Sequence, residues 1–173
     1  FVLSLIETAV EVAGGGINST DISRLLAIAK RMISAEVELF DQVEDVLADL
    51  YGSWPLVLIT KGDLLHQRAK VDRSGIDRYF AAVEVVADKT PAVYASILKR
   101  HDISPENFIM VGNSMRSDIL PVVDLGGRGV YVPNAGTWAY ENVEPPEEAN
   151  GHILHARTLA DVPEVIRGLG MAR

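Results

Sequence analysis

Residues 108–118 read Phe-Ile-Met-Val-Gly-Asn-Ser-Met-Arg-Ser-Asp, four apolar residues that end at a glycine and are followed by polar side chains. A short continuous apolar run predicts a strand that is buried on both faces, as in a parallel sheet. Residues 56–62 show the same pattern, with the apolar run Leu-Val-Leu-Ile before Thr-Lys-Gly. The two runs favour an α/β fold, in which helices cover both faces of a parallel sheet.

The segments around these runs alternate between strand and helix patterns. Further strands are predicted at residues 82–87, 129–132 and 153–154, and helices at residues 43–50, 66–74, 90–100, 119–125 and 159–169. Thr90 followed by Pro91 is a typical helix start, because threonine caps an N-terminus and proline fits the first turn. We therefore expect the α/β part of the chain to span residues 41–173.

Residues 1–40 have a different pattern, with apolar residues at helical spacing on both sides of three glycines, residues 14–16. This pattern predicts a helical hairpin. Ser19, Thr20 and Asp21 are each suitable N-caps for its second helix. The sequence begins with Phe rather than Met, from which we expect a further segment upstream.

The composition of the chain disfavours several classes of binding partner and bears on its location in the cell. The 173 residues correspond to about one domain. The chain has 16 Lys and Arg against 24 Asp and Glu, and its net charge of -8 disfavours nucleic acid and anionic membranes as partners. No apolar segment approaches the ~18 residues of a membrane span. Cysteine is absent, which is compatible with the cytoplasmic location that we expect.

Polar side chains follow three of the predicted strands. Ligands of open parallel sheets bind beyond the carboxyl ends of the strands, where the sequence has Thr60, Lys61, Lys89, Asn113 and Asp118. Their hydroxyl, ammonium and carboxylate groups, with backbone N–H groups at helix starts, suit a phosphate and a divalent cation. Each residue alone has a plainer interpretation, such as a capping threonine, a surface lysine or an aspartate that complements a helix dipole.

Three stretches carry a resemblance to a known family. Residues 58–62 (Leu-Ile-Thr-Lys-Gly), 87–91 (Ala-Asp-Lys-Thr-Pro) and 111–119 (Val-Gly-Asn-Ser-Met-Arg-Ser-Asp-Ile) resemble the second, third and fourth motifs of the haloacid dehalogenase-like (HAD) hydrolase superfamily. The resemblance covers about residues 40–133. It implies a HAD-like Rossmannoid parallel sheet, with residues 1–40 as part of a helical cap.

The resemblance also implies a function. An aspartate would attack a small phosphorylated substrate, water would hydrolyse the aspartyl-phosphate, and Mg²⁺ would offset the charge. Carried over to this sequence, Thr60 and the backbone N–H of Lys61 would hold phosphate oxygens, and Lys89 would neutralise charge on the phosphoryl group. Asn113 and Asp118 would bind or orient Mg²⁺. Thr60, Lys89 and Asp118 are therefore the expected catalytic residues, and Thr60, Lys61 and Lys89 the expected phosphate ligands.

The sequence departs from the family pattern in two ways. Asn113 stands where the family usually has aspartate, and an amide oxygen is a neutral ligand for Mg²⁺. The first motif, Asp-x-Asp, occurs nowhere in the chain. Its strand lies in this family between the strands predicted at residues 56–59 and 108–111. Without that strand both would have unpaired edges, so we expect an upstream segment to supply the strand and the nucleophile.

Two other functions remain open. A 2-haloacid dehalogenase also forms an aspartate ester but needs no metal, and the amide of Asn113 keeps this alternative open. A non-catalytic HAD-like binding protein is the second alternative, because a chain without the upstream nucleophile would be inactive.

Overall fold

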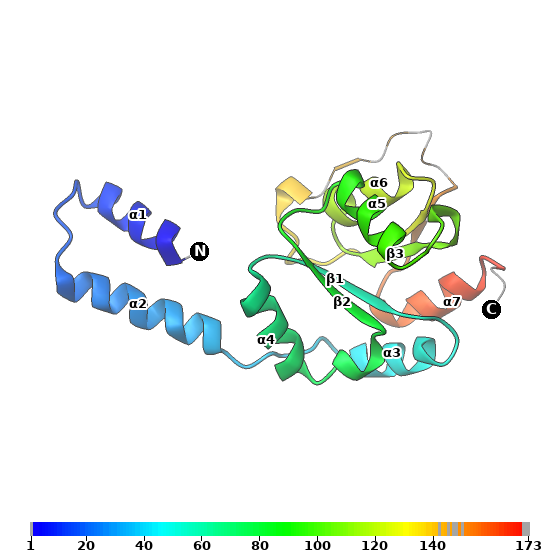
Figure 1. Cartoon of the computed structure of the whole chain (residues 1–173), viewed down its shortest axis with the longest axis horizontal. Helices are drawn as coiled ribbons and strands as arrows, with labels where there is room; N and C mark the ends of the chain where they lie inside the picture. The colour runs from blue at the N-terminus through cyan, green and yellow to red at the C-terminus, as the bar shows by residue number, and fades with distance from the viewer. Residues whose placement is uncertain (1, 142, 145, 147–148, 150, 171–173) are drawn as a thin grey trace. The chain divides into compact units, whose positions relative to one another are not determined.

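The computed structural model describes residues 2–141, 143–144, 146, 149 and 151–170. The chain divides into two compact units, and the boundary along the sequence falls between Glu38 and Leu39. The helices and strands, shown in Figure 1, are α1 (Val2–Val12), α2 (Ser19–Ser34), α3 (Val43–Tyr51), β1 (Val57–Lys61), α4 (Leu64–Ser74), β2 (Ala82–Val86), α5 (Pro91–Arg100), β3 (Ile109–Gly112), α6 (Leu120–Val123), β4 (Arg128–Tyr131), β5 (Ile153–His155) and α7 (Val162–Arg167).

The first unit is the helical hairpin of α1 and α2. Gly14 and Gly15 take left-handed backbone angles between the helices, with φ of 58° and 82°. The N-cap of α2 is Asn18, whose side chain accepts a hydrogen bond from the Asp21 N–H at 3.0 Å. The expected caps at residues 19–21 are therefore wrong, because the better-placed asparagine starts the helix earlier. No described helix is both long and apolar enough to cross a bilayer.

The second unit is the predicted α/β fold with parallel strands. β1 pairs with β2, and β3, β4 and β5 pair in that order, all in parallel. In the register, Thr60 lies opposite Val85 and Gly112 lies opposite Tyr131. The carboxyl ends of β1 and β2 therefore lie together, and so do those of β3 and β4.

Within the described residues, no strand pairs with the other edge of β1 or of β3. The Leu56 carbonyl and the Gly62 N–H bond to the β2 side. Because backbone groups alternate along a strand, those of residues 57, 59 and 61 face away from β2. The carbonyls of Phe108 and Gly112 bond to the β4 side in the same way, so β3 has a corresponding outer edge.

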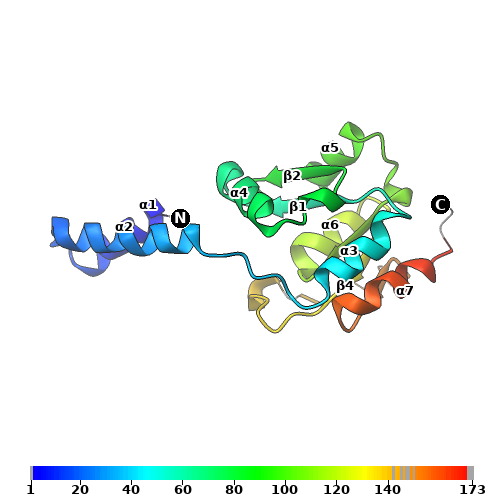
Figure 2. The ribbon, with the colours of Figure 1, turned by 90° about the horizontal axis from the view of Figure 1, so that it is seen from below.

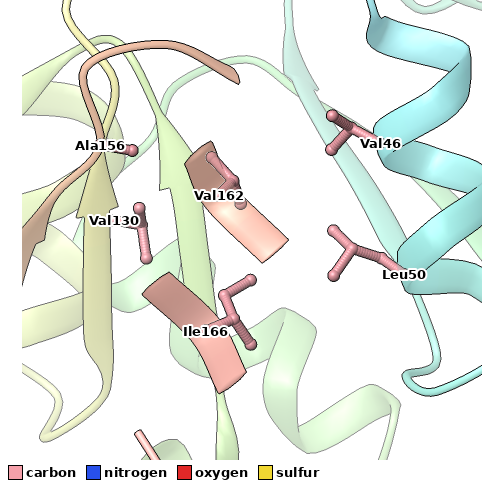
Figure 3. Packing of buried hydrophobic residues seen from close by; sticks show 6 residues of the cluster. All are labelled: Val46, Leu50, Val130, Ala156, Val162 and Ile166. Atoms are coloured by element: carbon pink, nitrogen blue, oxygen red, sulfur yellow. The ribbon is translucent and has the colours of Figure 1, made fainter. Parts of the chain in front are cut away.

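Helices cover both faces of the strands. α3 and α7 lie side by side on one face (Figure 2). Between them and the strands, Figure 3 shows a cluster of buried residues: Val46, Leu50, Val130, Ala156, Val162 and Ile166. On the opposite face, α5 and α6 contribute to a cluster that contains Ile59, Tyr94, Ile97, Met110 and Val122. Successive strand residues point to opposite faces, so Met110 packs in one cluster while Ile109 and Val111 pack against the other.

The predicted helix at residues 119–125 differs from the observed structure. A π-helical turn, Met115–Ile119, comes first, and α6 follows it as a single short turn. The Ser114 carbonyl accepts from the N–H groups of both Asp118, at 2.9 Å, and Ile119, at 3.2 Å. This shared acceptor widens the turn, which the apolar periodicity of the sequence does not reveal.

Candidate functional site

The five residues singled out in the sequence lie at the carboxyl ends of β1, β2 and β3. Hydrogen bonds and ion pairs connect Lys61, Lys89 and Asp118 into one polar network. Thr60 and Asn113 lie beside the network but direct their side-chain donors to other partners. The parallel arrangement thus brings together residues that are up to 58 positions apart, from Thr60 to Asp118.

The Lys89–Asp118 pair is the most buried ion pair of the network. Lys89 Nζ lies 2.6 Å from Asp118 Oδ1, and the two side chains are 13% and 7% exposed. The other carboxylate oxygen, Oδ2, accepts from the Ser114 N–H at 3.0 Å. Both oxygens of this buried carboxylate are therefore hydrogen-bonded, which compensates for its loss of hydration.

Gly112 makes room for this carboxylate. A Cβ atom at position 112 would overlap the Asp118 side chain. The glycine at the end of β3 therefore allows Asp118 to fold back against the strand. Tyr94 supports the same turn from α5, because its hydroxyl donates to the Ser117 carbonyl at 3.1 Å. Burial, and then the charge of Asp118, raise the pKa of Tyr94 well above its usual value, so the hydroxyl keeps its proton.

Lys61 lies at the exposed side of the network. Its Nζ is 3.5 Å from Asp88 Oδ1 and 3.8 Å from Glu141 Oε1, and its side chain is 41% exposed. Exposed ion pairs at such distances contribute little to stability. The Lys61 ammonium group is therefore available to an anion that approaches from solvent.

Glu141 is a site residue that the sequence analysis did not identify. Its Oε2 atom accepts from the hydroxyls of Ser114 and Ser117, both at 2.5 Å. These two hydrogen bonds, Ser114 first, hold the pKa of Glu141 below its usual value against the effect of burial, and the charges of Lys61 and Arg116 act in the same direction.

A signal for this part of the site was present in the sequence. The strand predicted at residues 129–132 is also followed by polar residues. Because ligands bind beyond the carboxyl ends of parallel strands, this fourth strand end points to the segment that contains Glu141.

Thr60 and Asn113 have neutral partners. Thr60 Oγ1 donates to Gln67 Oε1 at 3.1 Å, and Asn113 Nδ2 donates to Thr137 Oγ1 at 2.6 Å. In Asn113 this contact occupies the amino group and leaves the amide oxygen as an acceptor. Neither Gln67 nor Thr137 was expected from the sequence.

The oxygen donors of the site fit part of a Mg²⁺ coordination sphere. Within the described part of the chain, no three Asp, Glu or His side chains cluster to hold a metal ion. Mg²⁺ commonly binds through one or two carboxylates and completes its sphere with water and substrate phosphate. The Asp118 carboxylate and the Asn113 amide oxygen are donors of the required type, although Asp118 already bonds to Lys89.

Comparison with known proteins gives a consistent family. The sequence model of the haloacid dehalogenase-like hydrolases matches residues 5–126. A haloacid dehalogenase-like family hydrolase from Xanthomonas campestris has a similar crystal structure, with a TM-score of 0.87 and 35% identity, over 97% of this chain and 71% of that one.

Two curated phosphatases are also similar in sequence. The glyceraldehyde 3-phosphate phosphatase of Pyrococcus furiosus is 30% identical over 62% of this chain and 46% of its own length. The human N-acylneuraminate-9-phosphatase is 25% identical over 65% of this chain and 48% of its own. The matched part thus spans about half the length of these relatives.

Proposed function

Because the chain belongs to the haloacid dehalogenase-like hydrolase family, we propose that it forms part of a Mg²⁺-dependent phosphatase that acts on a small phosphorylated compound. The two curated relatives are named as phosphatases of small phosphorylated compounds, which supports this substrate class. Residues 1–40 act in this proposal as part of a cap that selects the substrate.

One observation carries the proposal: two lysines from neighbouring strand ends, Lys61 and Lys89, belong to the same polar network as the buried Asp118. Lys61 is partly exposed and offers its ammonium group and backbone N–H to phosphate oxygens. Lys89 stabilises the charge on the phosphoryl group, while Asp118 holds Lys89 in place. Thr60, at the end of β1, contributes its hydroxyl once a phosphate competes with Gln67 for it.

The proposed nucleophile is an aspartate outside these 173 residues. The outer edges of β1 and β3 support this proposal, because a parallel strand between them would pair with the backbone groups that face away from β2 and β4. The residue after such a strand would reach the same edge as Lys61 and Asn113. Its carboxylate would attack phosphorus, the ester oxygen would leave with the alcohol, and water would then release inorganic phosphate.

Asn113 and Asp118 are the residues of this chain that would hold Mg²⁺. A divalent cation supplies positive charge that stabilises the phosphoryl oxygens in the transition state. The contact between the Asn113 amino group and Thr137 favours an amide orientation that keeps the oxygen free for this purpose.

A comparison of released products tests the proposal. The full-length protein is incubated with a panel of sugar and triose phosphates and with 2-haloacids, with Mg²⁺ or with EDTA. Phosphate release that EDTA abolishes is the expected result. Halide release that persists in EDTA would instead support the dehalogenase alternative. Release of neither product would support a non-catalytic binding protein.

A further inference from the structure

The segment after β4 is attached to the segment after β3 by side-chain contacts. We call residues 137–141 the β4 loop. Thr137 accepts from Asn113, and the Tyr140 carbonyl accepts from Arg116 Nε at 3.0 Å. The Arg116 guanidinium also lies over the Tyr140 ring, 4.2 Å from its centre. The β4 loop therefore lies directly on the turn that carries Asp118.

Glu141 ends this loop and makes the central contact. Its side chain is 17% exposed, and its carboxylate lies between the Ser114 and Ser117 hydroxyls and the Lys61 ammonium. A carboxylate in this position would be costly without partners, but hydroxyl and ammonium groups surround it. Its contacts reach residues on both β1 and the segment after β3.

The Ser114 hydroxyl transmits the effect of Glu141 to Asp118. Ser114 donates its hydroxyl proton to Glu141 and accepts from the Ser117 N–H at 2.8 Å. The Ser114 backbone N–H donates to Asp118. A hydroxyl has one proton, so its donation to Glu141 directs its lone pairs toward the Ser117 N–H and fixes the start of the π-helical turn.

We infer that Glu141 is a positioning residue of the site, which fixes the Asp118 turn through Ser114 and Ser117 and restrains the Lys61 ammonium through its charge. The inference rests on the proposed phosphatase function. Glu141 forms no hydrogen bond or ion pair with Asp118 or Lys89 and acts on them through the two serines.

The two contacts of Glu141 have opposite consequences for the reaction. Fixing the Asp118 turn favours turnover, because a loosened turn misplaces the Lys89–Asp118 pair. The charge of Glu141 near Lys61 opposes the binding of an anion, because carboxylate and phosphate compete for the same ammonium group. Removal of the charge should therefore lower turnover and strengthen phosphate binding, a combination that a general loss of folded protein cannot produce.

The test uses Glu141→Gln in the full-length protein, a change that keeps the size of the side chain and removes its charge. We expect kcat to fall about tenfold, as for other groups that orient a ligand through a neighbour. Calorimetry with inorganic phosphate should show binding about threefold tighter. Glu144→Gln is the matched control, because Glu144 is exposed and its change alters net charge equally; we expect it to leave both values unchanged.

A mutant cycle tests whether the effect passes through the serines. In a Ser114→Ala/Ser117→Ala background, Glu141→Gln should lower kcat less than twofold while still strengthening phosphate binding. Equal losses of kcat in both backgrounds, or weaker phosphate binding with a lower unfolding midpoint, would overturn the inference. Absence of phosphate release from the wild type would overturn the proposed function, and phosphate affinity in the Glu141→Gln protein would then decide the inference.

Discussion

The polar groups on the two sides of the site differ in how deeply they are buried. After β3, the side chains of Ser114, Ser117 and Asp118 are buried and hydrogen-bonded. After β1 and β2, the paired side chains of Lys61 and Asp88 are 41% and 64% exposed. Buried, fully bonded groups are fixed in place, whereas exposed ion pairs exchange partners readily with solvent. The site therefore combines a rigid side that orients Asp118 with an open side that can receive an anion.

Removal of Lys89, whose ion pair with Asp118 connects the two sides, should have the largest effect. In Lys89→Met, kcat should fall by about 10²–10³, the loss that follows removal of one preorganised charged donor. The free energy of unfolding should also fall by about 3 kcal/mol, because Asp118 keeps a buried charge without its partner. Phosphate release and urea unfolding measure the two effects.

A second variant separates these effects. Lys89→Met/Asp118→Asn removes the unpaired charge and should recover most of the stability without recovering kcat. Lys61→Met, on the exposed side, should change stability by less than about 1 kcal/mol. Wild-type turnover in Lys89→Met would make Lys89 a structural residue only.

An added methyl group beside Asp118, on the rigid side, should have the next largest effect. Gly112→Ala places a methyl group against the Asp118 carboxylate and should reduce stability by about 2 kcal/mol. Gly52→Ala is the control, because its φ of -74° is ordinary and no atom lies within 4 Å of the added Cβ. Thermal unfolding measures both. Equal midpoints for the two variants would contradict the close approach of Asp118 to β3.

A further negative charge on the rigid side should strengthen Mg²⁺ binding. Asn113→Asp replaces a neutral oxygen donor with a carboxylate and should lower the Mg²⁺ concentration for half-maximal phosphate release severalfold. Titration of the EDTA-treated protein with Mg²⁺ measures this change. An unchanged midpoint would argue against Asn113 as a ligand, and full activity in EDTA would argue against the metal itself.

The smallest effect should come from Glu84 on β2, which bonds to Arg100 and His101 of the segment that follows β2. Burial alone would raise the pKa of Glu84 on β2, but hydrogen bonds from His101 and Arg100 outweigh it and lower that pKa from 4.5. A lowered pKa means that ionised Glu84 stabilises the fold above pH 4.5, and that this contribution is lost as the pH falls through the folded-state pKa.

Glu84→Gln should therefore reduce the free energy of unfolding by about 1 kcal/mol at pH 7. The difference from the wild type should shrink below about pH 4. Urea unfolding at a series of pH values measures it. A difference that is independent of pH would contradict an electrostatic role for Glu84.

Much of the fold could be predicted because its strands leave a strong signal. The runs at residues 56–59 and 108–111 are apolar throughout, as strands covered on both faces must be. Thr90 with Pro91 likewise identifies the start of α5, and Thr90 accepts from the Val93 N–H as a cap. These features depend on neighbouring residues alone, so the sequence suffices.

Two features of the site were harder to predict, the turn that follows β3 and the position of Glu141. The widened turn after β3 needs one carbonyl, that of Ser114, to accept from two N–H groups, and no local pattern indicates this. Glu141 lies 27 positions after Ser114 and reaches it only because β3 and β4 are neighbours in parallel. Their pairing could be expected from the alternating pattern, but the conformation of the β4 loop could not.

The π-helical turn at Met115–Ile119 has a consequence for how this segment can change in evolution. A π turn contains one residue more than an α turn, and each residue of a helix advances it by about 100°. If the turn reverted to α geometry through a one-residue deletion, Asp118 and the buried Val122 would change their relative orientation by about that angle. The extra residue therefore fixes the angle about the helix axis between Asp118, which faces the site, and Val122, which faces the core.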